Sequence, residues 1–91
     1  MVLGMKDDAK ILHEVISKTI KTVQKNKNMK YLELCYGSDI PTSTFDDIIR
    51  ANRMSTFFNI AKVVKALGLS FAEFGAMLDE LLPDDFLESD D

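Results

Sequence analysis

The chain has 91 residues, enough for one small domain, and its apolar fraction of 46% is too high for a disordered protein. No apolar run approaches the roughly 18 residues that a membrane-spanning helix needs. The net charge of −4 is unevenly distributed, since residues 1–30 carry +4, residues 31–70 are neutral and residues 71–91 carry −8. A lone DNA-binding domain usually has a basic footprint, and the chain as a whole is not basic.

Two further features bear on compartment and chemistry. Cys35 is the only cysteine, which excludes an internal disulfide, and we expect it to be a small buried apolar residue rather than a reactive thiol. The stretch from Met1 to Met5 is too short and mixed for a signal peptide, so we expect a cytoplasmic protein.

The first predicted element is a helix over about residues 8–26. It begins at Asp7 or Asp8 and ends where Asn26 and Asn28 tolerate a left-handed cap. Its apolar stripe repeats at helical spacing in Leu12, Val15, Ile16, Ile20 and Val23. Its other face is rich in lysine, and that face is either simply solvated or directed at phosphates: Lys10, Lys18, Lys21 and Lys25.

Two short helices follow, over about residues 30–37 and 41–50. Gly37, Ser38 and Asp39 are the expected turn between them, and Pro41 suits the first turn of the second of these helices. Four side chains are expected to supply apolar contacts for the first: Met29, Leu32, Leu34 and Cys35. Ile40, Phe45 and Ile48 are expected to hold the second against the core, leaving four polar side chains outward: Thr42, Ser43, Asp46 and Asp47.

Two more helices are predicted over about residues 56–67 and 70–82. Ser55 or Thr56 caps the first, Gly68 ends it, and Ser70 with Glu73 forms a capping box for the second. Four phenylalanines at helical spacing are expected in the core: Phe57, Phe58, Phe71 and Phe74. Pro83 ends the last helix, and residues 84–91 form an acidic tail that we expect to be frayed, with Phe86 and Leu87 as anchors.

This order of elements carries a resemblance. From Leu34 to Phe74 the chain resembles the lambda-repressor/Cro-like (Xre) family of transcriptional regulators, through Leu34-Cys35, Asp39-Ile40, Pro41 to Phe45, Ile48, Arg50 to Arg53, Phe57 and Lys62 to Ser70. With the first helix included, the resemblance covers about four-fifths of the chain. It implies an all-α, five-helix, lambda-repressor-like domain with a helix-turn-helix over residues 1–83, followed by the acidic tail 84–91.

The resemblance also implies a function. The helix 41–50 would lie in the major groove of double-stranded DNA, and the helix 30–37 would approach the backbone through its N-terminus. Carried over residue by residue, the implied DNA-binding residues are Lys30, Tyr31, Thr42, Ser43, Asp46, Asp47, Asn52 and Arg53. Arg50 would either brace the reading helix or reach a phosphate.

Four positions depart from the family pattern. Asp39 stands where the family has a turn glycine, and Tyr31 where it commonly has glutamine. Asp46 and Asp47 place two carboxylates on the reading face, where they would repel phosphates but could accept from the amino group of cytosine.

These departures leave two hypotheses about function open. Under the first hypothesis, the protein is a sequence-specific DNA-binding transcriptional regulator. Under the second, it is a protein-interaction or antitoxin-like module on the same fold, which no longer reads DNA and whose acidic C-terminus docks on a basic protein partner. A homodimer is expected through the fifth helix and its neighbours (Met77, Leu81, Phe86, Leu87) or through the first helix.

An enzyme is not expected. His13 is the only histidine and is expected to be a solvated or partly buried structural residue. Where two aspartates are neighbours in the sequence, their side chains point about 100° apart on a helix, so the two carboxylates do not converge on one site. No metal-ligand spacing, phosphate loop or cofactor motif is present, so no metal and no cofactor is expected.

Overall fold

The computed structural model describes residues 7–88, which form five α-helices and no strand. The helices are α1 (Asp8–Asn26), α2 (Tyr31–Ser38), α3 (Thr42–Arg50), α4 (Phe57–Ala66) and α5 (Phe71–Leu81). The prediction of an all-α chain with five helices is therefore confirmed for the described residues, and each predicted end differs from the observed one by at most one residue.

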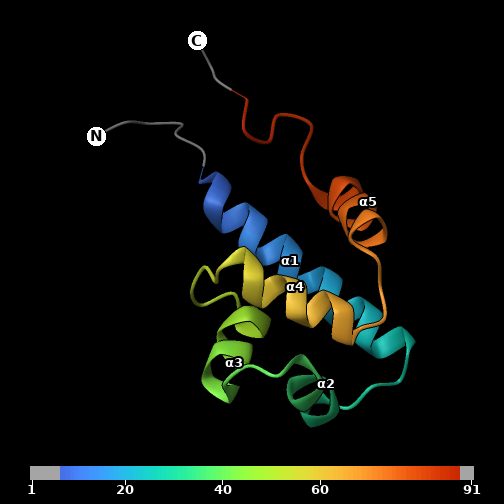
Figure 1. Cartoon of the computed structure of the whole chain (residues 1–91). Coiled ribbons are helices and arrows are strands. Elements are labelled where there is room, and N and C mark those ends of the chain that lie inside the picture. The colour runs from blue at the N-terminus through green and yellow to red at the C-terminus, as the bar shows by residue number, and fades with distance from the viewer. Residues whose placement is uncertain (1–6, 89–91) are drawn as a thin grey trace.

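The long helix α1 organises the packing. It packs against α3 and α5, while α4 packs against α2 and α5. In Figure 1, α2 and α3 lie together beyond α4, and α5 lies on the opposite side of α1. Phe45, Ile20 and Leu34 are fully buried at the centre of this arrangement, so the apolar faces of α1, α2 and α3 meet in one core.

The predicted caps are present. The Asp7 carboxylate accepts from the Lys10 N–H (3.0 Å), and the Thr56 hydroxyl accepts from the Asn59 N–H (3.2 Å). At the start of α5, Ser70 and Glu73 bond each other's backbone N–H groups at 3.0 and 2.9 Å. These side chains satisfy N–H groups that a helix start leaves unpaired, which fixes where the helices begin.

The connection between α2 and α3 is tighter than predicted. Gly37 and Ser38 still belong to α2, so the turn consists of Asp39, Ile40 and Pro41. Asp39, which stands where the lambda-repressor-like pattern has a turn glycine, has φ +55°, a left-handed conformation that glycine favours and aspartate tolerates. Ala51, which follows α3, has the same φ of +55°, and no residue type there signalled it.

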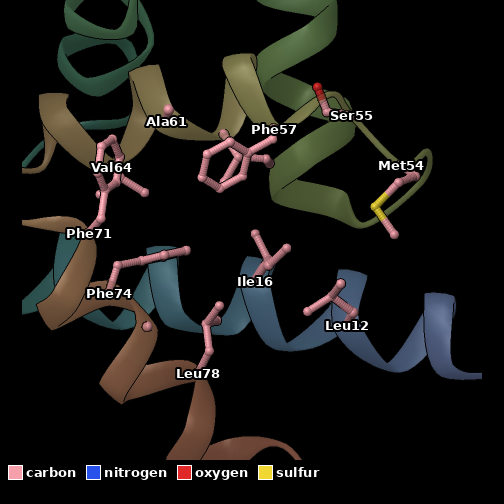
Figure 2. Close-up of a pocket in the computed structure, with 12 residues that line it drawn as sticks. Leu12, Ile16, Met54, Ser55, Phe57, Ala61, Val64, Phe71, Phe74 and Leu78 are labelled. Carbon is pink, nitrogen blue, oxygen red and sulfur yellow. The ribbon is translucent and has the colours of Figure 1, made fainter. Parts of the chain in front are cut away.

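The prediction that all four phenylalanines lie in the core is wrong for three of them. Phe74 is buried, but Phe57, Phe58 and Phe71 are 74%, 68% and 51% exposed. Phe57 and Phe71 line a hollow between α1, α4 and α5 (Figure 2), whereas Phe58 lies beside Ser38 and Asp39, and no other described element covers these three rings. Leu32 on α2 is also exposed, contrary to the prediction.

The described part of the acidic tail is ordered in a turn. The Phe86 N–H donates to the Pro83 carbonyl (3.0 Å), and the Leu87 N–H donates to the Asp8 carboxylate (3.3 Å). The expectation of a frayed tail is therefore wrong for residues 84–88, while residues 89–91 lie outside the described part. Among the described helices, none has the length and apolar character to cross a membrane.

Candidate nucleic-acid interface

Hydrogen bonds from α4 and α1 fix the two short helices α2 and α3 to the body of the molecule. The Lys62 ammonium on α4 donates to the Asp39 carbonyl in their connection (3.2 Å), while the bond from the buried Ser38 hydroxyl to the Leu34 carbonyl (2.7 Å) lies within α2. The Ser17 hydroxyl on α1 donates to the Ile49 carbonyl at the end of α3. These bonds hold α3 with one side in the core and the other toward solvent.

Thr42 and Ser43 lie at the exposed start of α3, as predicted. The N-cap residue is Pro41, whose side chain accepts no hydrogen bond, so no side-chain cap occupies the first N–H groups of the helix. Exposed hydroxyls beside uncapped N–H groups form a surface that donates hydrogen bonds. The Thr42 hydroxyl is also within 3.9 Å of the Cys35 sulfur, and Cys35 is buried as predicted.

Asp46 is not a free carboxylate on the surface. Its Oδ1 accepts from the Tyr31 hydroxyl (2.8 Å) and from the Arg50 Nε (3.1 Å). The Tyr31 ring packs edge-on against the buried Phe45 ring, with 5.0 Å between centroids. Burial of the phenol, followed by its hydrogen bond to the Asp46 carboxylate, raises the pKa of Tyr31 to about 12. Asp46 therefore joins α2 to α3, a role that the sequence did not predict for it.

Arg50 forms an ion pair within α3, which is compatible with the first of the two roles left open for it, that of a brace. Its ion pair with Asp46 connects residues four apart on α3. The guanidinium itself remains largely exposed, so the ion pair leaves most of its donors facing solvent.

A polar hollow of about 300 Å³ lies between α3 and the start of α4. It brings together the predicted residues Ser43, Asp47 and Arg53. It also includes side chains that the sequence had identified only as structural or not at all: Thr44, Ser55, Thr56 and Asn59. These four side chains are polar but uncharged, so neither charge nor apolar periodicity signals them in the sequence.

The remaining predicted residues lie apart from this hollow. Lys30 is exposed at the start of α2, where its own N–H donates to the Glu33 carboxylate (3.2 Å). That carboxylate opposes the approach of a phosphate to the start of α2, which weakens the predicted contact there. Asn52 is exposed after α3, and its N–H closes the end of the helix by donating to the Asp47 carbonyl (3.0 Å).

Two observations concern His13 and metal ligands in the described residues. His13 is more buried than predicted, at 6% exposed, and its Nε2 has no hydrogen-bond partner within residues 7–88. No group of three or more potential metal ligands occurs in the described part of the chain.

Comparison of the chain with protein-family models, with curated proteins and with solved structures gave no match. The function proposed below therefore rests on the residues and geometry of this chain.

Proposed function

We propose that this protein is a sequence-specific regulator of transcription that binds double-stranded DNA and inserts α3 into the major groove. The observation that carries the proposal is the α2–turn–α3 unit, in which a three-residue turn presents the hydroxyls of Thr42 and Ser43 beside the hollow that contains Arg53. Two short helices joined by a tight turn support the assignment of a helix-turn-helix like that of the lambda-repressor-like family, which the sequence resembles.

The proposed contacts fall into two groups. Thr42 and Ser43 meet base edges, because hydroxyl groups at the start of a recognition helix can both donate and accept. Arg53 and Asn52, with the donors around the polar hollow, meet the phosphates and set the position of α3. Asp46 acts through Tyr31 and Arg50 rather than on a base, and Asp47 is the one carboxylate left at the reading face.

The first experiment is binding of the purified protein to a generic labelled duplex, titrated from about 50 to 200 mM salt. Binding that falls steeply with salt is the expected result, because phosphate contacts release counterions. Absence of binding at the low end of the range would overturn the proposal.

A second experiment separates base reading from phosphate binding. After selection of a preferred sequence, the double variant Thr42→Ala/Ser43→Ala should lose about 10- to 100-fold of its affinity for that sequence. Its affinity for generic DNA should stay unchanged. Equal loss on both kinds of DNA would contradict the reading role of the two hydroxyls.

The exposed phenylalanines of α4 and α5 favour a second candidate, a protein-interaction or antitoxin-like module that does not read DNA. Asp47→Arg distinguishes the two functions without disturbing the network around Asp46. In a DNA reader it shifts the preferred sequence, whereas in the interaction module it creates DNA binding that the natural chain lacks. Asp79→Arg, with the same charge change on an exposed site of α5, is the matched control.

A further inference from the structure

Three residues of α3 are exposed, and two of them are the proposed base readers Thr42 and Ser43. The third is Arg50, whose side chain is 68% exposed. Residues seven apart on an α-helix point within about 20° of each other, so Arg50 continues the line of Ser43 along the helix. The opposite side of α3 is buried in the core through Phe45 and Ile48. Arg50 therefore lies on the side of α3 that would face the base edges in the proposed complex.

The guanidinium of Arg50 is held over the middle of α3 rather than beyond its end. Its Nε donates to Oδ1 of Asp46, four residues earlier, at 3.1 Å. Four residues of an α-helix rise about 6 Å, and side chains lean toward the N-terminus of their helix. The bond to Asp46 therefore brings the guanidinium back along α3, toward Thr42 and Ser43.

Asp46 is itself held from the neighbouring helix. Its Oδ1 accepts a second hydrogen bond, from the Tyr31 hydroxyl of α2 at 2.8 Å, and the Tyr31 ring packs on Phe45 in the core. A carboxylate fixed in this way restricts the conformations of the arginine bonded to it, which lowers the entropy cost of placing the guanidinium on a partner. The packing of α2 on α3 thus determines the position of Arg50 through two hydrogen bonds.

The bond to Asp46 leaves the outer edge of the guanidinium available. It uses the Nε–H, and neither terminal amino group of Arg50 has a hydrogen-bond partner within residues 7–88. Parallel N–H groups of an arginine match the O6 and N7 acceptors that guanine presents in the major groove. The positive charge of Arg50 also offsets the adjacent Asp46 carboxylate, which would otherwise repel DNA.

We infer, on the basis of the proposed insertion of α3 into the major groove, that Arg50 reads guanine there and that Asp46 is the positioning residue that presents it. A phosphate is the other acceptor that an arginine fork fits. Phosphates lie along the edges of the groove, however, whereas this guanidinium lies on the side of α3 opposite the core. Asn52 and Arg53, in the loop after α3, are better placed for the phosphates.

The test alters the two acceptors of guanine one at a time. After selection of a preferred duplex, each guanine of the site is replaced in turn by adenine, which lacks O6, or by 7-deazaguanine, which lacks N7. At one position adenine should lower the affinity of the natural chain about 10- to 100-fold, and 7-deazaguanine should lower it as well. Arg50→Ala should bind all three duplexes equally at that position, while substitutions elsewhere in the site affect both proteins alike.

Arg53→Ala is the matched control, because it removes the same charge at a proposed phosphate contact and should weaken binding to all of these duplexes by one common factor. A uniform loss in Arg50→Ala would assign Arg50 to a phosphate and overturn the inference, as would a preferred site in which no guanine depends on Arg50. Either result leaves the proposed DNA binding intact. A natural chain that binds no duplex would overturn the proposed function and the reading of guanine together.

The positioning role of Asp46 is tested by Asp46→Ala, which frees the Arg50 side chain and removes one negative charge. Affinity for generic DNA should rise, because a repulsive carboxylate is lost, whereas the preference for guanine over adenine should fall about threefold or more. Asp46→Asn, which keeps an oxygen acceptor for the Arg50 Nε, should retain part of the preference. A fall of both affinities by the same factor in Asp46→Ala would mean that Asp46 only supports the fold, and it would overturn the positioning role.

Discussion

At the scale of single residues, the most informative group is Tyr31, whose hydroxyl joins α2 to α3 through Asp46. Burial and the bond to Asp46 raise the pKa of Tyr31 to about 12, so the folded protein favours the protonated phenol. The stabilisation from this group is therefore complete below about pH 10, the ordinary pKa of tyrosine, and is lost as pH rises through about 12.

We predict that Asp46→Asn lowers the pKa of Tyr31 but leaves it above its ordinary value, because burial remains. Titration of the phenolate absorbance measures this in a Tyr36→Phe background, which leaves one tyrosine. Tyr31→Phe should reduce the free energy of unfolding by about 1 kcal/mol, since it leaves the half-buried Asp46 with one donor fewer. An unchanged pKa in Asp46→Asn would contradict the role of the carboxylate.

Replacing either of two glycines by alanine should change the free energy of unfolding, in opposite directions at the two positions. Gly68 follows α4 with φ +79°, and a Cβ atom there would lie 3.0 Å from the Lys27 ammonium nitrogen, which itself donates to the Leu67 carbonyl (2.7 Å). Gly68→Ala should therefore lower the free energy of unfolding by about 1 kcal/mol. Gly75→Ala, in open space inside α5, should raise it by about 0.5–1 kcal/mol. Denaturant unfolding of the two variants beside the natural chain measures both changes, and the same sign for both would refute the argument.

At the scale of elements, the capping box of α5 links helix stability to pH. Hydrogen bonds from the Ser70 backbone and side chain lower the pKa of Glu73 below its ordinary value of 4.5. Because the folded state favours the ionised form, this contribution is present above about pH 4.5 and is lost as pH falls through the lowered pKa.

We predict that Ser70→Ala raises the pKa of Glu73 and lowers the melting temperature. NMR titration of the Glu73 carboxyl and thermal unfolding at neutral and acid pH measure the two effects. The difference in melting temperature between Ser70→Ala and the natural chain should shrink at low pH, where Glu73 is protonated in both. A difference that stays constant with pH would mean that the box contributes nothing through charge.

The helices also show which features of the fold could be predicted from the sequence alone. Helix starts were predictable because a cap is a local interaction: Asp7, Thr56 and Ser70 each bond an N–H three residues ahead. The exposure of Phe57 and Phe71 was not predictable. Periodicity gives the direction in which a side chain points from its own helix, but whether another helix covers that direction depends on how α4 and α5 diverge around α1.

In the candidate site, too, some features could be predicted from the sequence and others depend on packing. Thr42 and Ser43 were predictable as exposed residues because they follow a turn and precede the apolar face of α3. The bond between Tyr31 and Asp46 was not, because it joins residues 15 apart whose distance is set by the packing of α2 on α3. The polar hollow needed the fold as well, since it combines α3 with residues of the next loop and helix.

At the scale of the whole molecule, the decisive feature is that opposite charges occupy different parts of one small chain. Residues 48–72 hold four basic residues and no acidic one, whereas residues 84–91 hold five carboxylates and no base. The carboxylates of this acidic segment compete with phosphates for the same positive surface. The acidic tail should therefore weaken non-specific DNA binding.

We predict that a chain ending at Leu82 binds generic duplex DNA more tightly than the full chain does. The truncation changes the net charge from −4 to +1. The gain should be largest at about 50 mM salt and shrink toward 200 mM, because the repulsion that the tail contributes is screened by salt. Fluorescence anisotropy of a labelled duplex at both salt concentrations measures this gain in affinity.

A full-length chain in which the five tail carboxylates are replaced by their amides keeps the length of the tail, and it should bind as the truncated chain does. If only the truncated chain gained affinity, the tail would act through its bulk rather than its charge, and if neither did, the acidic segment would have no part in DNA binding.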